Sequence, residues 1–232
     1  MKKEEKMREK IVGFMIAGVL VLGLGFVSTP TRAQLSLGAV GGYYSPNFGL
    51  INEEFDFYFN DLYGTAFEFK AGMLYGLALG YQLPGRFRLR LEYNSFESKT
   101  SDEYSEYWVF NETRWKDDFT LTVRPVILSL LYELSPAYIG AGIGSFYSKL
   151  NRDSEWEEYT FGILWDTGSG SFSDSDSPTG LVLLGGFRFG AEPVFLNLEA
   201  RYIVGTKAKL EDWPTEIDLS GLQLCLLGGF RF

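Results

Sequence analysis

The sequence IDLSGLQLCLLGGFRF, residues 217–232, decides the fold expected for this chain. Alternate residues counted back from its end are apolar or small, whereas the intervening residues are mixed; the first set is Phe232, Phe230, Gly228, Leu226, Leu224 and Leu222. Because side chains alternate between the two faces of a strand, the stretch predicts a strand with one apolar, aromatic face. A soluble core could cover such a face. The length of the strand, its terminal aromatic and a secretion-type N-terminus instead favour a membrane barrel whose apolar face contacts lipid.

The heptapeptide LLGGFRF occurs twice, at residues 183–189 and 226–232. Such identity is improbable by chance, so we expect both copies to occupy equivalent strand ends at the same rim of one barrel. Duplication of a hairpin and similar selection on equivalent strands are both open as its origin.

The N-terminal segment has the pattern of a secretion signal. A charged, lysine-rich head (Met1–Lys10) precedes an apolar run (Ile11–Val27), and Ala33 offers a small residue at a cleavage position. We therefore predict a signal peptide at residues 1–33 and a single domain at residues 34–232. A membrane anchor is the competing interpretation of the apolar run, which is short for a helical span.

The composition argues against several functions. The net charge is −9, and an acidic chain is poor in the cations that neutralise phosphate, so no nucleic-acid partner is expected. Cys225 is the single cysteine, which excludes a disulfide and a cysteine-rich metal site within the chain. Histidine is absent, and with it the usual general base of enzymes. We expect no cofactor.

Strand-like runs alternate with short turns marked by proline and with long acidic segments. The long segments are residues 47–65, 99–118, 151–178 and 205–216. Short turns at one rim and long loops at the other are typical of an up-and-down barrel. We therefore predict an all-β fold, an eight-stranded antiparallel up-and-down transmembrane β-barrel. Its expected strands are residues 35–45, 66–83, 87–96, 119–134, 137–150, 179–190, 194–204 and 217–232.

Side-chain alternation predicts which residues face lipid. In residues 66–83 the aromatic parity is expected to point outward. In residues 119–134 we expect Leu121 and Val123 to point outward, with a bulge near Pro125 that reverses the alternation. Aromatic residues near the strand ends predict two interfacial girdles. They are Tyr81, Phe87, Tyr132, Phe187, Phe195 and Phe230 at the short-turn rim, and Tyr43, Phe69, Tyr93, Phe119, Tyr147 and Tyr202 towards the loops.

Glycine and alanine dominate the opposite face of residues 66–83 and 137–150. Small residues leave room inside a narrow eight-stranded barrel for charged side chains. The charged residues on the inward parity are Glu68, Lys70, Arg88, Arg90, Glu92, Arg124, Glu133, Arg188, Glu199, Arg201 and Arg231. They predict either a polar conduit or a network of buried ion pairs that plugs the lumen. We favour the plug, because an eight-stranded interior is normally filled.

Two stretches resemble a known family. The alternation that ends at the C-terminus resembles the assembly signal of bacterial outer-membrane barrels, and its residues are Leu224, Leu226, Phe230 and Phe232. The run Leu121–Tyr147 resembles the central hairpin of the OmpA/OmpX-like eight-stranded family, in which a proline-containing strand precedes a short turn and a glycine-alternating strand.

The resemblance implies a Gram-negative outer membrane, with the short turns in the periplasm and the long loops at the cell surface. It also implies contact with outer-membrane lipid and lipopolysaccharide, insertion by the barrel-insertion machinery, and a monomer. Members of this family include adhesins, lipid-modifying enzymes, small-molecule conduits and structural proteins, so the family alone does not define the activity.

Catalytic motifs are weak in this sequence. Asp166-Thr167-Gly168-Ser169 contains the triplet of aspartic proteases, but those enzymes need two such aspartates facing each other. Lipid-modifying barrel enzymes rely on a histidine as general base, and this chain has none. We therefore predict that the protein is not an enzyme.

The long segments carry many carboxylates and all five tryptophans, which are Trp108, Trp115, Trp156, Trp165 and Trp213. One interpretation is a solvated rim whose aromatics pack in strands that extend above the bilayer. We favour a non-enzymatic, adhesion-like surface protein whose loops bind divalent cations or an extracellular partner. The alternative is a narrow, porin- or OmpW-like conduit for small solutes or apolar molecules.

Overall fold

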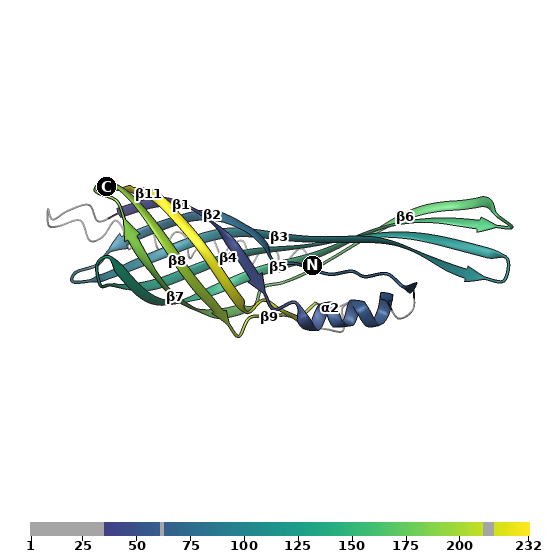
Figure 1. Cartoon of the computed structure of the whole chain (residues 1–232), viewed down its shortest axis with the longest axis horizontal. Coiled ribbons are helices and arrows are strands. Elements are labelled where there is room, and N and C mark those ends of the chain that lie inside the picture. The colour runs from purple at the N-terminus through teal and green to yellow at the C-terminus, as the bar shows by residue number, and fades with distance from the viewer. Residues whose placement is uncertain (1–34, 61–62, 211–215) are drawn as a thin grey trace, which may run out of the picture.

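The computed structural model describes residues 35–60, 63–210 and 216–232, so the predicted signal peptide at residues 1–33 lies outside the described part. Its main feature is a closed ring of antiparallel strands (Figure 1). The ring strands, in chain order, are β1 (Leu35–Pro46), β2 (Gly72–Gln82), β3 (Phe87–Trp108), β4 (Asn111–Glu133), β5 (Ala137–Thr160), β7 (Thr179–Phe189), β8 (Val194–Val204) and β11 (Gly221–Arg231). The predicted eight-stranded barrel is confirmed.

The ring closes because β1 pairs with β2 on one side and with β11 on the other. Leu37 lies opposite Phe230 in β11 and opposite Leu79 in β2. Each ring strand therefore has two hydrogen-bonded neighbours. Within the barrel, closure therefore leaves no ring strand with an open edge, which is the condition for a sheet to lie in hydrocarbon.

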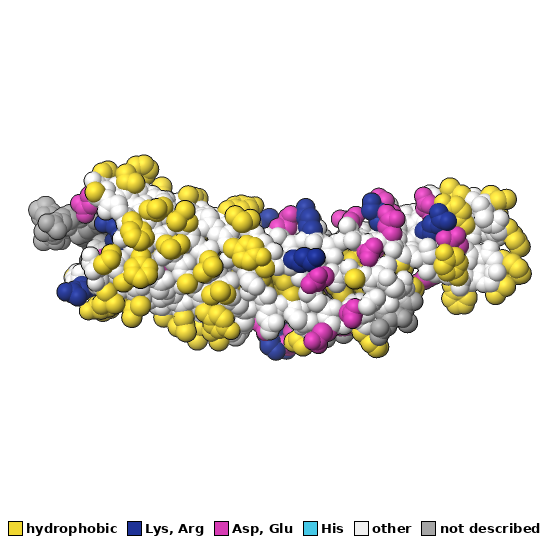
Figure 2. Space-filling model, in the orientation of Figure 1, with side chains coloured by type: hydrophobic (Ala, Val, Ile, Leu, Met, Phe, Trp, Pro, Cys, Tyr) yellow, Lys and Arg dark blue, Asp and Glu magenta, His cyan; other side chains and the backbone are white. Residues whose placement is uncertain are grey.

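The outside of the ring is apolar (Figure 2). Large apolar side chains are exposed on the successive ring strands, among them Leu37, Tyr43, Met73, Tyr75, Leu77, Tyr93, Ile139, Ile143, Leu183, Phe187, Leu198, Tyr202, Leu224, Leu226 and Phe230. In water such an exterior would be unstable, whereas lipid tails stabilise it. In the described part of the chain, no helix is long and apolar enough to cross a bilayer.

Three ring strands continue far beyond the barrel. β3, β4 and β5 have 22, 23 and 24 residues, and β6 (Ile163–Asp176) pairs with the far half of β5. We call residues 97–118 and 148–176 the projecting sheet (Figure 1). The prediction of long loops at residues 99–118 and 151–178 is therefore wrong, because these acidic segments form strands with paired backbones.

Short elements lie at the base of the projecting sheet. α2 (Gly49–Phe55) and the π-helical turn η1 (Asp56–Asn60) follow β1. A small hairpin pairs β9 (Lys207–Ala208) with β10 (Ile217–Asp218). The predicted last strand is consequently shorter than expected, because β11 begins at Gly221.

Two predictions of side-chain direction are wrong. β4 pairs with β5 without interruption from Asn111 opposite Thr160 to Glu133 opposite Tyr138, so there is no bulge at Pro125. Leu121 and Val123 are fully buried inside instead of pointing outward. Likewise β2 begins at Gly72, and the preceding residues belong to an irregular segment in which Phe67 and Phe69 are buried. Of the proposed girdle residues, Phe69, Phe119 and Phe195 are also buried.

Phe195 is buried because it has the inward parity of β8, which it shares with Glu199 and Arg201. The other errors have one physical cause. Inside the bilayer the apolar parity of a strand faces outward to lipid. Above the bilayer the same strand is surrounded by water, so its apolar parity must face inward. On β4 the polarity of the outer face changes close to Arg124. Moving along β4 from the barrel into the projecting sheet, the half-buried Val126 is followed on the same face by the exposed Arg124.

Candidate functional site: the barrel interior and the projecting sheet

Four charged residues meet in the middle of the barrel. Arg90 and Glu92 come from β3, whereas Glu199 and Arg201 come from β8. These two strands are four places apart in both directions around the ring, so they face each other across the lumen. All four side chains are buried, and we call them the central ion cluster.

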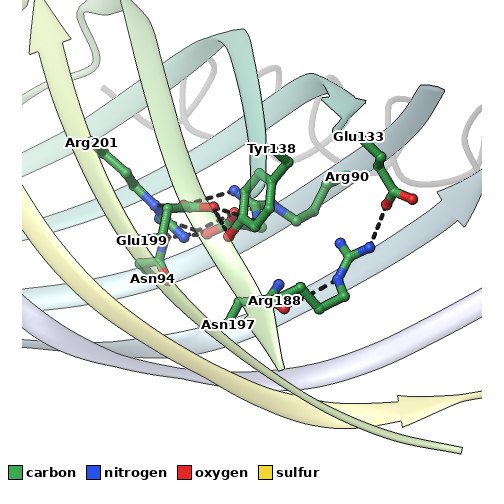
Figure 3. A network of polar contacts seen from close by, with 9 residues as sticks. Arg90, Asn94, Glu133, Tyr138, Arg188, Asn197, Glu199 and Arg201 are labelled. Carbon is green, nitrogen blue, oxygen red and sulfur yellow. Dashed lines mark hydrogen bonds and ion pairs between the residues drawn. The ribbon is translucent and has the colours of Figure 1, made fainter. Parts of the chain in front are cut away.

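The central ion cluster alternates positive and negative groups (Figure 3). Arg90 donates two hydrogen bonds of 2.8 Å to the two carboxylate oxygens of Glu199, and its Nε lies 2.6 Å from Glu92 Oε1. Arg201 lies 2.7 Å from Glu92 Oε2 and also donates to Glu199. Each buried charge is thereby compensated by two opposite charges, which is what permits charge in a dry interior.

Neutral residues complete the central ion cluster. The Tyr138 hydroxyl on β5 donates to Glu199 Oε2 at 2.7 Å, and Asn94 donates to Glu92 at 3.4 Å. Glycines make room for them: a Cβ at Gly186 would lie 2.8 Å from Tyr138 Oη, and one at Gly76 would lie 2.3 Å from Asn94 Oδ1. Sequence reasoning missed Tyr138, although it lies on the same inward parity as the glycines of β5.

A second group lies nearer the short turns. Glu133 is 3.1 Å from Arg88 and accepts a hydrogen bond from Arg188. Arg188 also donates to Asn197 at 3.2 Å (Figure 3). Arg231 is 3.8 Å from the exposed Glu192. Guanidinium groups outnumber carboxylates here; Arg88 is buried, whereas Glu133, Arg188 and Arg231 are only partly buried.

Three of the predicted lumen residues lie elsewhere, so their inward placement is wrong. Glu68 and Lys70 form an exposed ion pair of 3.3 Å outside the barrel strands. Arg124 is exposed on the outer face of β4. The sequence prediction failed for all three because it assumed that apolar residues face outward along the whole strand. That rule holds only where the strand contacts lipid.

Aromatic side chains fill the interior above the central ion cluster. Along the inner face of β3, Glu92 and Asn94 are followed by Phe96, whose ring centroid is 5.1 Å from that of Tyr44. Further along, Phe55 of α2 packs against Phe119 of β4 at 4.9 Å. We call this set the aromatic cluster; its buried members are Tyr44, Phe48, Phe55, Phe59, Phe67, Phe69, Phe96 and Phe119. α2 is thus held over the end of the barrel by ring packing.

The projecting sheet contains one buried acid that the sequence analysis missed. Asp117 accepts hydrogen bonds from Arg152 Nη2 at 2.7 Å, Arg152 Nε at 3.1 Å and the Tyr104 hydroxyl at 3.1 Å, and one from Ser154. Burial, reinforced by the charge of Asp117, raises the pKa of Tyr104. The bonds to Asp117 raise the pKa of Arg152 despite its partial burial. The inward parity of β4 would have identified Asp117 once the inversion was known.

The remaining acidic residues do not form a metal centre. Within the described ranges, no group of three or more acidic or cysteine side chains is placed to hold a metal ion. Asp166 is exposed on β6 and accepts a hydrogen bond from the Thr167 backbone. Trp108 and Trp165 are exposed, Trp115 and Trp156 are partly buried, and Trp213 lies outside the described residues.

Closed pairing, an apolar exterior and a charged interior therefore occur together. The protein is a transmembrane β-barrel. No protein-family model matches the chain, and no curated protein matches it in sequence.

Three solved structures match most of this chain. The chain is similar to Neisserial surface protein A, with 15% identity, a TM-score of 0.44, and coverage of 85% of this chain and 97% of that one. It is similar to Ail, the attachment invasion locus protein of Yersinia pestis, solved with the heparin analogue sucrose octasulfate (14% identity, TM-score 0.38, coverage 86% and 97%). CarO of Acinetobacter baumannii matches at 11% identity and a TM-score of 0.41, with coverage of 87% and 98%.

Proposed function

We propose that the protein is a non-enzymatic surface protein whose plugged barrel anchors the projecting sheet, and that this sheet contacts an extracellular partner. One observation carries the proposal. β3, β4 and β5 continue from the barrel into the projecting sheet, β4 and β5 with unbroken pairing and β3 and β4 in a single register. A rigid extension of this kind presents side chains well above the membrane, where a partner can reach them.

The barrel interior supports an anchoring role. The central ion cluster joins opposite walls of the ring, and the aromatic cluster lies above it. An ion that crossed the barrel would have to break buried ion pairs and displace packed rings, and both are costly. We therefore expect no stable unit conductance from the purified protein in planar bilayers. Reproducible unit conductance would contradict the plug and favour a narrow conduit for small solutes or apolar molecules.

Shortening the projecting sheet tests the surface role directly. The register places Asp102 opposite Asp117 and Asp153 opposite Ser171, so residues 103–116 and 154–170 can each be replaced by an Asn-Gly turn. We expect bacteria that display this variant to lose adherence to a eukaryotic cell monolayer. The amount of folded barrel, measured by its migration on unboiled gels, serves as the control. Unchanged adherence at equal barrel levels would contradict the proposal.

We also propose that the outward residues of β11 and Phe232 form the signal read by the barrel-insertion machinery. Leu224, Leu226 and Phe230 are all exposed on the outer face. The second LLGGFRF copy supplies a control, because Phe189 ends β7 at the same rim: Phe189 lies opposite Leu196, and Phe230 lies opposite Val194.

The matched variants are Phe232→Ala and Phe189→Ala. We expect Phe232→Ala to reduce sharply the amount of barrel assembled in cells at matched synthesis. Phe189→Ala removes a similar lipid-facing ring, worth up to about 1.5–3 kcal/mol of burial, and should mainly lower the stability of assembled protein. Equal assembled levels for the two variants would show that the terminal position has no special role.

A further inference from the structure

The far end of the projecting sheet exposes a cluster of large apolar side chains (Figure 2). We call it the tip patch, and it consists of Tyr107–Phe110, Phe161 and Ile163–Trp165. Every one of these side chains is at least half exposed, and Val109 is 91% exposed. An apolar cluster of this size is unfavourable in water and marks a surface that a partner or a membrane covers.

The tip patch is a single built surface. The turn between β3 and β4 lies beside the turn between β5 and β6, because Asn111 pairs with Thr160. The Phe161 backbone N–H donates to the Phe110 carbonyl at 3.0 Å, and the two rings pack with centroids 5.1 Å apart. The β3–β4 and β5–β6 turns are thereby held together and form one apolar end of the projecting sheet.

The tip patch covers both faces of the sheet. Tyr107 and Trp108 are consecutive in β3 and are both exposed, and so are the three consecutive residues Ile163–Trp165 in β6. Consecutive strand residues point to opposite faces. A folded protein that docks on one face would leave the other face in water. A bilayer surface, by contrast, surrounds an inserted end on all sides, and tryptophan and tyrosine favour its interfacial layer.

The charges behind the tip patch indicate the kind of bilayer. Residues 106–114 and 157–166 carry five carboxylates and one arginine, Arg114. Arg114 is paired with Glu112 at 2.7 Å and lies over the Tyr159 ring at 4.6 Å. Its hydrogen bond to Glu112 lowers the pKa of that carboxyl group, which keeps it ionised near neutral pH. This acidic collar would be repelled by anionic lipid.

We propose that the tip patch inserts into the interfacial layer of a facing zwitterionic bilayer, with the acidic collar remaining in water at its surface. The proposal rests on the surface role proposed above and names the partner of the projecting sheet as a zwitterionic lipid surface.

The test uses the full chain reconstituted in nanodiscs and protein-free phosphatidylcholine vesicles with brominated acyl chains. We expect the nanodiscs to float with the vesicles and their tryptophan fluorescence to be quenched. The double variant Trp108→Ser, Trp165→Ser should float with the vesicles about tenfold more weakly or worse, because binding scales with the apolar area inserted. Both side chains are exposed, so the variant should fold normally.

A matched control removes two exposed aromatics elsewhere. Phe57 and Tyr58 on η1 are exposed by 63% and 46% and do not belong to the tip patch, so Phe57→Ser, Tyr58→Ser should bind like wild type. Adding anionic lipid to the vesicles should weaken binding at low salt, and salt should restore it.

Failure of wild-type nanodiscs to float, or equal flotation of the tip variant, would overturn the proposal and leave a protein as the occupant of the tip patch. The adherence test of the shortened projecting sheet is independent of these results. The surface role can therefore survive even if vesicle binding fails.

Discussion

The barrel and the projecting sheet share three strands but place their polar residues on opposite sides. In the barrel, the inner face of β3 carries Arg90 and Glu92, and the outer face carries Tyr93. Farther along the same strand, Phe96 lies inside and Lys99 lies outside. Backbone pairing is the same in both regions. The comparison shows that alternation defines the two faces of a strand, whereas the surrounding solvent decides which face is apolar.

The largest expected effect comes from breaking the central ion cluster. Arg201→Leu leaves Glu92 and Glu199 with one shared cation in place of two, so about 3–5 kcal/mol of stability should be lost. The matched change in the projecting sheet is Lys99→Leu, which removes a surface ion pair of 2.9 Å with Glu97. It should cost about 0–1 kcal/mol, because water screens the pair.

Urea unfolding of the folded protein in detergent, followed by its shift on unboiled gels, measures both variants. Similar midpoints for Arg201→Leu and Lys99→Leu would show that the barrel interior is hydrated, and the contrast between the two regions would fail.

A smaller and local effect is expected in the projecting sheet. Asp117→Asn keeps the size of the side chain but removes the charge that Arg152 and Tyr104 contact. Loss of this charged hydrogen bonding should cost about 1.5–3 kcal/mol. Hydrogen exchange should accelerate in residues 97–118 and 148–160, whereas β8 and β11 should be unchanged. Faster exchange throughout the barrel would show that the two regions unfold as one unit.

The smallest effect is expected at the boundary between the two regions. Arg124→Ala should change the unfolding free energy by less than about 0.5 kcal/mol, because the side chain is exposed on the outer face of β4. Arg88→Ala is the informative comparison, since Arg88 is buried and paired with Glu133 at 3.1 Å. A large loss for Arg124→Ala would instead support the inward placement that the sequence alone suggests.

Much of the barrel could be predicted from the sequence, because lipid imposes one rule on every ring strand. Residues 194–204 were predicted with the bounds that β8 has, and the glycine-rich faces of β2 and β5 are inside. The projecting sheet could not be predicted in the same way. Its strands are acidic and rich in serine, so the composition of residues 151–178 resembles a loop, and only pairing with β4 and β5 orders them.

The candidate site was predictable to the extent that its residues lie within the membrane. Arg90, Glu92, Glu199 and Arg201 all have the inward parity expected from the sequence. Their ion pairs across the lumen form only because the closed ring places β3 opposite β8. No local sequence pattern predicts that these two strands face each other. Asp117 was missed because the position at which the polar face of the strand changes from inside to outside depends on the thickness of the bilayer. No short sequence motif indicates that position.

The constant register of β3, β4 and β5 makes the projecting sheet a spacer of fixed height. At roughly 3.3 Å per residue, β4 rises about 40 Å along its length between Arg124 and Asn111. Inserting two residues in each of its four strands would lift the tip by about 6–7 Å and keep every side chain on its face. Inserting one would turn each side chain beyond it to the other face. The height of the tip above the barrel is therefore set in steps of two residues.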